Sequence, residues 1–520
     1  MNHLVRLAVG AALAVSAGSA LAVDSSTISA NNFLRIGGAT STDPVIQGLA
    51  LNPAAGVCAS GGTFTVDVYT ATNQFMVACT AKNFSNTSYS ALSGQNIGFI
   101  KESNGGSGNG TGALANHTTL AFLNPAAPNC NAGVPVAATA TNVAYTLHAN
   151  CTGFLAPAQA PQLGIADVEG RLLGYTGSNL TANPLVDVVF GVPVSLPLYR
   201  ALQAAQGLAA TDACNTVPSL TRAQITALYT GNIYDSTVLV SQLTGAALDA
   251  SAKAIHICRR GNSSGTQAGT AAYFLNQNCT PAASAPQPFF LPDNSNCTAG
   301  GCAWPTQTIG ASVVDFRGNL VYAGSGSGQV VNCLDYYGAQ ASDNYAVGVL
   351  STEFPYVGHN YRFVRVDGAI ASVEQTMNGN YSFFTSDVLN TANDISYTGI
   401  QTAMKNYISQ LAGSPNLIIP LQQVDGVCGP VFDNSNPPVQ IVAGDGGIMA
   451  SSTYLVSLGA YPAGIAPPFT FTEARAFPVN TMTKKPTGAI NNCQPPVVDA
   501  FSPAEAAGGD PRATISTYAP

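Results

Sequence analysis

Twice in this chain a short apolar run leads into a turn of small residues and then into a helix signal. The first turn, Gly37–Thr42, follows the run Phe33–Ile36. The second turn, Arg259–Thr266, follows the run Ala254–Cys258. Such a unit points several backbone N–H groups at one place, where an anion can bind. Because strand-like runs and helix signals alternate along the chain, the sequence predicts an α/β fold.

Further elements follow from periodicity. Apolar runs rich in β-branched residues predict strands, and apolar residues at helical spacing predict helices. The expected strands are 163–169, 186–196 and 345–350, and the expected helices begin near Thr221, which forms a capping box with Gln224, and near Ser396. The composition of Asn104–Gly112 is typical of a flexible loop, and that of 280–335 is typical of a long disulfide-linked excursion.

Charged residues are scarce. Together 18 Lys and Arg and 26 Asp and Glu make 8% of the 520 residues, against about 25% in an ordinary soluble domain. A nucleic-acid surface needs several cations on one face. Adjacent cations occur here only as Arg259/Arg260 and Lys484/Lys485, and the net charge is -8. The composition therefore excludes nucleic acid as a partner.

The first 22 residues have the pattern of a secretory signal peptide. Arg6 supplies the positive charge, 7–15 the apolar stretch and Ala20–Ala22 a small-residue cleavage site. No cysteine directly follows that site, and no later apolar run reaches about 18 residues. We therefore expect an exported protein, periplasmic or secreted, without a lipid anchor or a membrane span.

All 12 cysteines lie beyond the cleavage site, and none forms a C-x-x-C pair. In an exported chain this pattern favours disulfides, up to six of them, over a metal or haem site. Proximity favours the pairs Cys58/Cys79 and Cys130/Cys151, and the remaining connectivity stays open. The cysteines are Cys58, Cys79, Cys130, Cys151, Cys214, Cys258, Cys279, Cys297, Cys302, Cys333, Cys428 and Cys493.

The two turns carry the groups that an oxyanion needs. A helix N-terminus offers N–H groups, hydroxyls donate short hydrogen bonds, and the Arg260 guanidinium can bind two oxygens. Asp167, at the end of another strand, adds an acceptor, which is useful only for an anion that still carries a proton, as phosphate does and sulfate does not. The candidate ligands are Thr40, Ser41, Asp167, Arg260, Ser264, Gly265 and Thr266.

At this point the chain resembles the periplasmic phosphate-binding proteins, the solute receptors of ABC phosphate importers. The similarity spans most of the mature chain, with insertions in the cysteine-bearing regions. The matching segments are Gly37–Thr42 (GGATST), the glycine-serine loop near Ser107, Gly164–Glu169 (GIADVE), Ser219–Ile233 (SLTRAQITALYTGNI), Arg259–Thr266 (RRGNSSGT) and Val364–Phe383 (VRVDGAIASVEQTMNGNYSF).

The resemblance implies a two-lobed periplasmic binding protein of type II. One lobe would combine 24–190 with 346–520, and the other would be 191–345. The ligand, an inorganic oxyanion and by this resemblance phosphate, would bind in a cleft between the lobes, which would close by a hinge for presentation to an ABC-type permease. A monomer without cofactor, metal or covalent chemistry is expected.

The resemblance also implies residue roles. In the family an Arg, a Ser, a Gly N–H and a Thr of one loop bind phosphate, and these roles fall on Arg260, Ser264, Gly265 and Thr266. Thr40, Ser41 and Ser107 would bind as well, and Asp167 would accept the phosphate proton. Asn262 is also an expected ligand. It stands where the family has an Asp, which would leave Arg260 a fuller positive charge and relax the choice of anion.

Two other functions are compatible with parts of the sequence. Gly261–Gly265 (GNSSG) matches the G-x-S-x-G elbow of serine hydrolases, but only His359 follows it, and an anion-binding turn explains it better. The low charge and the Asn-, Thr- and Gly-rich insertions also suit a secreted surface or matrix protein on a binding-protein scaffold. Affinity for an oxyanion would separate that alternative from a receptor.

Overall fold

The computed structural model describes residues 24–498 with internal gaps. The gaps are 62–63, 140, 176–178, 245–252, 278–319, 340–344, 355, 415–416, 420–430, 433–439, 443–446, 452–467 and 485–489. The expected signal peptide, 1–22, lies outside the described residues. Within those residues, every helix is too short or too polar to span a bilayer.

The described residues form a mixed α/β architecture around one 16-stranded sheet, as the alternating pattern predicts. In path order its strands are β11 (Val321–Gly324), β10 (Ile255–Arg260), β12 (Tyr345–Gly348), β8 (Leu180–Ser195), β15 (Phe384–Ala392), β7 (Leu163–Ala166), β1 (Phe33–Gly38), β4 (Asn96–Glu102), β3 (Gln74–Thr80), β2 (Val66–Ala71), β6 (Tyr145–His148) and β5 (Val134–Val136). Off this path, β13 (Leu350–Ser351), β14 (Tyr361–Val366) and β18 (Ile448–Ala450) pair with β8, and β9 (Ser219–Leu220) pairs with β14. Two small hairpins join β16 (Val431–Phe432) with β17 (Gln440–Val442) and β19 (Met482–Thr483) with β20 (Val497–Val498).

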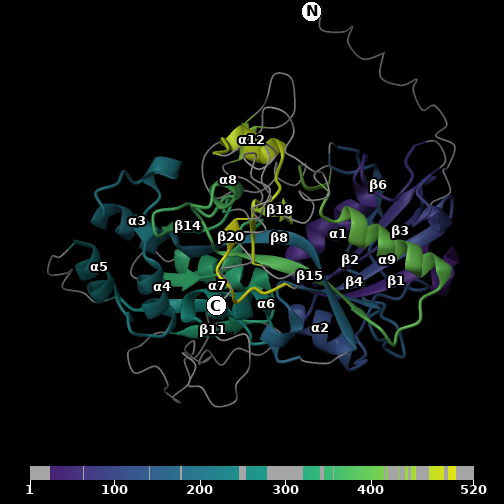
Figure 1. Cartoon of the computed structure of the whole chain (residues 1–520), viewed down its shortest axis with the longest axis horizontal. Helices are drawn as coiled ribbons and strands as arrows, with labels where there is room; N and C mark the ends of the chain where they lie inside the picture. The colour runs from purple at the N-terminus through teal and green to yellow at the C-terminus, as the bar shows by residue number, and fades with distance from the viewer. Residues whose placement is uncertain are drawn as a thin grey trace, which may run out of the picture.

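The long strand β8 connects two groups of strands. Its first part, 180–189, pairs with β15, which leads on to β7 and β1, whereas 192–195 pairs with β14. Figure 1 shows the elements of 33–148 on one side of β8 and β15 and those of 196–338 on the other. The predicted strand 186–196 is confirmed, and it begins earlier, at Leu180.

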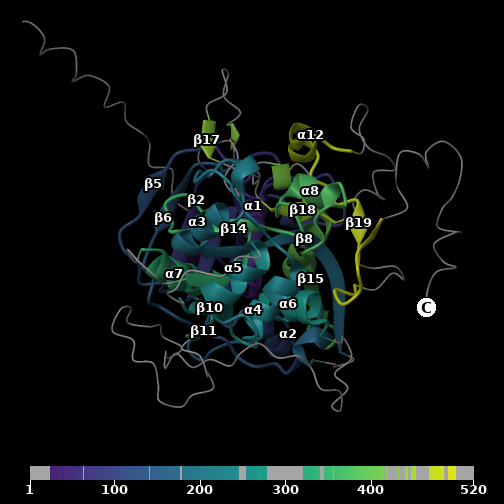
Figure 2. The same cartoon turned by 90° about the vertical axis from the view of Figure 1, so that its left-hand side faces the viewer.

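Helices cover both groups of strands. They are α1 (Asp43–Leu51), α2 (Ser107–Ala115), α3 (Leu196–Ala205), α4 (Arg222–Tyr229), α5 (Ser236–Thr244), α6 (Gly265–Leu275), α7 (Ser327–Gly338), α8 (Val373–Met377), α9 (Gly399–Leu411) and α12 (Phe471–Ala476). The predicted capping box is confirmed, because Thr221 caps α4 and bonds reciprocally with Gln224. In Figure 1 α6 lies between α4 and α2, and in Figure 2 it lies beside α4 and above α2.

The expected loop Asn104–Gly112 is wrong, because helix α2 begins at Ser107. Glycine disfavours a helix by about 1 kcal/mol per residue relative to alanine, but here the glycines allow close packing. A Cβ on Gly110 would overlap the carbonyl oxygen of Ile165, and a Cβ on Gly164 would overlap that of Gly110. The backbone of α2 therefore packs directly on β7, and this contact outweighs the local preference.

The expected excursion 280–335 is wrong at its C-terminal end. Val321–Gly324 forms the edge strand β11, parallel to β10, and α7 begins at Ser327. The valines and the leucine of α7 face a core cluster that includes Tyr361 and Phe363. Burial of this apolar surface stabilises the segment as part of the sheet structure.

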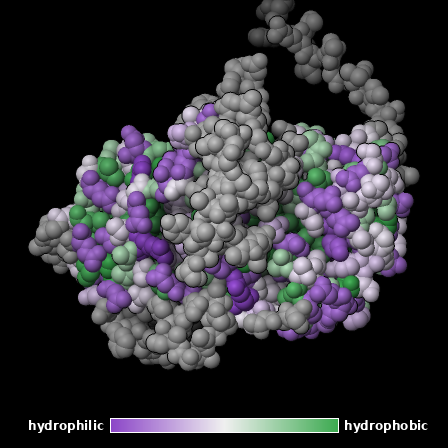
Figure 3. All heavy atoms as spheres, in the orientation of Figure 1, coloured by the Kyte–Doolittle hydropathy of each residue, from purple (hydrophilic) through white to green (hydrophobic). Residues whose placement is uncertain are grey.

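The described surface carries few charges, in line with the composition. Figure 3 shows hydrophilic and hydrophobic residues mixed over the described part of this face. The interior holds a large apolar cluster that spans both groups of strands, with fully buried side chains such as Leu34, Val188, Val347 and Phe190.

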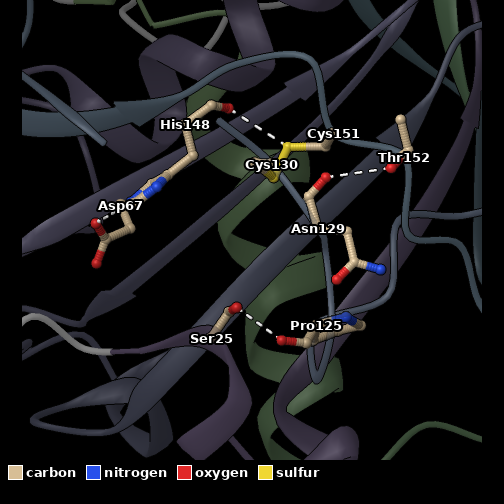
Figure 4. The surroundings of a disulfide bond; sticks show 8 residues. All are labelled: Ser25, Asp67, Pro125, Asn129, Cys130, His148, Cys151 and Thr152. Atoms are coloured by element: carbon tan, nitrogen blue, oxygen red, sulfur yellow. Dashed lines mark hydrogen bonds and ion pairs between the residues drawn. A yellow bond between two sulfur atoms is a disulfide. The ribbon is translucent and has the colours of Figure 1, made fainter. Parts of the chain in front are cut away.

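The two expected disulfides, Cys58–Cys79 and Cys130–Cys151, are confirmed. Beside the second, the hydroxyl of Thr152 donates to the carbonyl oxygen of Asn129 at 3.2 Å (Figure 4). A third disulfide joins Cys258 of β10 to Cys333 of α7. Cys214 and Cys493 are disulfide-bonded as well.

Removing either short-range disulfide should cost stability by the same amount. Each closes a loop with a sequence separation of 21, and loop closure of that length contributes about 3 kcal/mol by restricting the unfolded chain. We expect the double alanine variants at Cys58/Cys79 and at Cys130/Cys151 each to lose about 3 kcal/mol in urea unfolding. Unequal losses would show that native-state contacts, rather than loop entropy, set the effect.

Candidate anion-binding site

The first predicted turn lies at the end of β1, where the chain enters the short helix η3 (Thr40–Thr42) and then α1. The fully buried ammonium of Lys101 donates to the carbonyl oxygen of Ala39 at 2.6 Å and to the carboxylate of Asp43. Lys101 therefore connects Ala39, which precedes η3, with Asp43, which follows it. As a result, Ser41 is held at 3% exposure at the end of the sheet.

A further turn, which ends at Gly106, precedes α2. Gly106 has a φ of 58°, a conformation that favours glycine, and Ser107 is fully buried at the first position of the helix. The backbone N–H of Asp167 donates to the Ser107 hydroxyl oxygen at 2.9 Å. The N–H of Gly108 donates to the carbonyl oxygen of Ser263 at 2.8 Å, which ties the start of α2 to the turn before α6.

The second predicted turn, Arg259–Thr266, joins β10 to α6. Arg260 is the last residue of β10 and is 2% exposed. Its backbone N–H donates to the side-chain oxygen of Gln267 at 3.2 Å, while the Gln267 N–H donates to the hydroxyl of the N-cap residue Ser264 at 3.4 Å. The strand and the helix that follow each other in the sequence are thus locked together around the arginine.

The turn before α2 and the turn before α6 meet at Gly265. A Cβ at this position would lie 2.9 Å from the Cβ atoms of both Ser107 and Asp167, so only glycine fits there. From the next residue, the hydroxyl of Thr266 donates to Asp167 Oδ2 at 2.9 Å. The N-termini of α2 and α6 therefore adjoin the same carboxylate.

A fourth helix N-terminus, that of α7, completes the arrangement and was not predicted as part of a site. Arg260 donates from Nη1 to the hydroxyl of Ser327 at 2.7 Å and from Nη2 to the carbonyl oxygen of Ser325 at 2.9 Å. The hydroxyls of Ser327 and Thr40 are 3.4 Å apart. The signal that could have found it is the glycine-serine turn 324–328 after an apolar run, the same pattern as in the other turns.

A second carboxyl lies beside Asp167 and was also missed. The Ser41 hydroxyl oxygen is 2.5 Å from Asp167 Oδ1 and 3.2 Å from Asp387 Oδ2. Thr385 donates to the other oxygen of Asp387 at 3.3 Å. Asp387 sits inside β15 and is fully buried. Its sequence signal is a single acidic residue within a strand of apolar and hydroxyl residues.

All predicted ligands except Asn262 come together in this way. We call the assembly the Arg260 site. It comprises Thr40, Ser41, Ser107, Asp167, Arg260, Ser264, Gly265 and Thr266, with Ser327 and Asp387 in addition. Asn262 is exposed and accepts a hydrogen bond from Arg259 at 3.4 Å. The structure therefore places Asn262 beside Arg259, and not beside Arg260, whose charge it was expected to influence.

Burial and charge act in opposite directions on the ionisable groups of the site. Burial lowers the pKa of Arg260, and the negative charges of Asp167 and Glu353 oppose this shift; the guanidinium stays charged because its ordinary pKa is above 12. Burial, reinforced by the charge of Asp167, raises the pKa of Asp387 well above its ordinary value. Asp387 therefore keeps its proton at pH values where an exposed aspartate has lost it.

This geometry suits an inorganic oxyanion. The N-termini of four helices gather around Arg260 and Asp167. Each N-terminus carries a partial positive charge and N–H groups that have no partner within the helix. In Arg260, Nε has no hydrogen-bond partner among the described residues. Hydroxyl groups from three of the turns lie within hydrogen-bond reach of one another or of Asp167.

The hydrolase elbow acts as a helix cap in this structure. Ser263, the residue in the nucleophile position, is exposed, and Ser264 caps α6. The described histidines contact groups elsewhere: His117 contacts Asp394, His148 contacts Asp67, His256 accepts from the N–H of Leu320, and His359 contacts Asp335. Over the described ranges, no cluster of His, Cys, Asp and Glu could hold a metal ion.

No family model matches the chain, and no curated protein matches its sequence. Solved structures that are similar to this chain at low identity include the following three. One, from Clostridium perfringens, is described as a phosphate ABC transporter substrate-binding protein with bound phosphate; it is 12% identical over 74% of this chain and 98% of that chain, with a TM-score of 0.35.

The other two are comparably distant. An ABC-type phosphate transport receptor from Vibrio cholerae is 11% identical over 74% of this chain and 97% of its own, with a TM-score of 0.34. PstS from Borrelia burgdorferi is 10% identical over 72% of this chain and 91% of its own, with a TM-score of 0.29.

Proposed function

We propose that this protein is an exported solute-binding protein that captures an inorganic oxyanion, phosphate in preference to sulfate, at the Arg260 site. The observation that carries this proposal is that the N-termini of α1, α2, α6 and α7 are joined by hydrogen bonds to one another or to the buried Arg260 and Asp167. Such N-termini attract anions, and a guanidinium binds two oxygens of a planar or tetrahedral anion. The anion would replace the hydrogen bonds that Arg260 makes to Ser325 and Ser327.

The preference for phosphate rests on Asp167. Its two oxygens accept hydrogen bonds from Ser41 and Thr266, and an ionised carboxylate can only accept. When an anion takes over these hydroxyls, Asp167 needs a new donor. Phosphate supplies one because it carries a proton at neutral pH, whereas sulfate does not and would leave two acceptors in contact.

Closure of two lobes is part of the proposal. Ser41, Ser107 and Asp167 belong to the proposed lobe 24–190 with 346–520, and Arg260 and Thr266 belong to the proposed lobe 191–345. The hydrogen bond from Thr266 to Asp167 joins these ranges within the site itself, and the strand pairs β10–β12 and β8–β14 join them elsewhere. A ligand that bridges both ranges would favour the closed arrangement and could be released when a hinge opens near β8.

The remaining parts of the proposal concern location and partners. The disulfides favour an oxidising compartment outside the cytoplasm. In that compartment a monomer would present its anion to an ABC-type permease and would carry out no covalent chemistry. The nearest alternative is a secreted surface protein that keeps the scaffold but binds no anion.

Calorimetric titration of the phosphate-stripped mature protein with phosphate and then with sulfate tests the proposal. We expect phosphate to bind and sulfate to bind about 5- to 150-fold more weakly, since an unpaired buried acceptor costs about 1–3 kcal/mol. In D167N the amide can donate to sulfate, so the ratio of the two affinities should fall toward one. Failure of the parent protein to bind either anion would favour the surface-protein alternative.

A further inference from the structure

Asp387 enters the Arg260 site from a different strand than any predicted ligand. β15 pairs with β7 on one side and with β8 on the other (Figure 1). This pairing brings a fully buried carboxyl against Ser41, which also contacts Asp167. Ser41 therefore joins two carboxyl groups from separate strands.

The hydrogen atoms at this junction can be counted. A serine hydroxyl has one hydrogen and two acceptor positions. The shorter contact of Ser41, 2.5 Å, is with Asp167, and the longer one, 3.2 Å, is with Asp387. If Ser41 donates to Asp167, a second ionised carboxylate at 3.2 Å would face an oxygen that has no hydrogen for it. A protonated Asp387 resolves this by donating to the Ser41 oxygen.

The charges around Asp387 favour the same assignment. Asp167 at the end of β7 and Glu353 after β13 act on it with negative charge. Arg260, the cation of the site, acts on those two carboxylates. Two like charges in one buried network do not both ionise readily, and the more deeply buried group retains its proton. Burial and these charges raise the pKa of Asp387 well above its ordinary value.

Two further charges lie along β15 and interact with each other. Asp187 of β8 pairs in register with Ser386, and the ammonium of Lys484 donates to the carbonyl oxygen of Phe384. The carboxylate of Asp187 acts electrostatically on Lys484. Burial lowers the pKa of Lys484 to about 8, so the two charges offset one another only below that pH. Above it Lys484 becomes neutral in the parent and in a D387N variant alike, and the ratio of their affinities cancels this change.

We propose that Asp387 is a specificity-determining residue of the Arg260 site: it holds one proton and, in the ligand-free site, donates it to the Ser41 oxygen while Ser41 donates to Asp167. This inference rests on the proposed anion-binding function. When Asp387 holds this proton, the carboxyl groups of Asp167 and Asp387 together carry a single negative charge beside Arg260. Asp167 then remains the acceptor for a protonated anion. Loss of that proton adds a second negative charge next to the bound anion.

The sign of the pH effect on binding follows from this charge. Below the pKa of Asp387 the pair carries one negative charge, and anion affinity is retained. As the pH rises through that pKa, the added charge repels the anion, and affinity falls. The variant D387N is neutral at every pH, and its amide can still donate to Ser41. It should therefore reproduce the protonated form.

The experiment is a phosphate titration of parent and D387N from about pH 5 to about pH 9, read as the ratio of their dissociation constants. The ratio cancels the ionisation of phosphate itself. We expect affinities within about threefold at the acid end and a parent at least about tenfold weaker than D387N at the alkaline end. The exposed Asp394 provides the control, because D394N should follow the parent at all pH values.

Unfolding without ligand tests the proton separately. A carboxyl group whose pKa is raised in the folded protein binds more protons in the folded state than in the unfolded state. The free energy of unfolding of the parent therefore falls as the pH rises above the ordinary pKa of aspartate. D387N lacks this loss, and its stability advantage over the parent should therefore grow with pH. A constant difference would overturn the assignment of the proton to Asp387.

The outcomes separate the two proposals. If the parent binds phosphate but its affinity ratio to D387N does not change with pH, the role of Asp387 is refuted and the receptor function stands. If the parent binds neither phosphate nor sulfate at any pH, the receptor function is refuted, and the specificity role falls with it.

Discussion

Replacing Arg260 with alanine is expected to weaken phosphate binding at least about 100-fold. The guanidinium is 2% exposed and donates from Nη1 and Nη2 to Ser327 and Ser325. In the proposed complex these donors bind the anion instead, and each charge-assisted hydrogen bond contributes about 1.5–3 kcal/mol. Loss of two such bonds corresponds to a factor of about 100 or more. Calorimetric titration with phosphate measures the effect.

Two controls separate binding from folding. R260K keeps the positive charge but lacks the planar fork, so we expect it to bind phosphate more weakly than the parent and more tightly than R260A. Thermal unfolding of all three proteins shows whether the alanine variant is folded, since the substitution removes a positive charge that interacts with the buried Asp167. A folded R260A with the affinity of the parent would refute the site.

Replacing Gly164 with alanine is expected to lower the free energy of unfolding by about 3 kcal/mol or more. A Cβ at this position would overlap the carbonyl group of Gly110 in α2, and neither backbone can move without disturbing β7 or the helix. Overpacking of this kind costs about 1–3 kcal/mol, and more where backbone atoms collide. Because α2 carries Ser107, G164A should also weaken phosphate binding. Urea unfolding followed by circular dichroism measures the stability.

The matched control is Gly399, the first residue of α9. A Cβ there would meet no atom within 4 Å, so G399A should leave stability unchanged or raise it by up to about 1 kcal/mol. If G164A proved as stable as G399A, α2 would not pack directly against β7. The correction of the predicted loop Asn104–Gly112 to a helix depends on that packing.

The locally encoded parts of the structure were predictable. The capping box of α4 needs only Thr221 and Gln224, three positions apart, and it is present. The disulfides Cys58–Cys79 and Cys130–Cys151 join near neighbours and are present as well. In each case the interacting groups are close in the chain, so little chain entropy opposes their meeting.

Local sequence patterns gave wrong predictions at two segments, 104–112 and 321–335, where tertiary packing outweighs the local preference. The glycines of 104–112 disfavour a helix by themselves, yet α2 forms because Gly110 lets its backbone contact β7. The turn before Ser327 has the same strand, glycine and serine pattern as the turn before α6, but it lies within a segment whose composition suggests an irregular excursion. Its pairing with β10 through β11 makes it part of the sheet.

By itself the sequence determined the chemistry that the chain can bring to an anion: few charges, one arginine at the end of a strand, and hydroxyl residues at helix starts. Which groups meet was decided by the tertiary structure. Ser41 and Asp387 are 346 positions apart, and they touch only because β15 pairs with β7 and β7 pairs with β1. Sheet pairing sets such contacts through burial and hydrogen bonding between distant segments, and no local pattern records them.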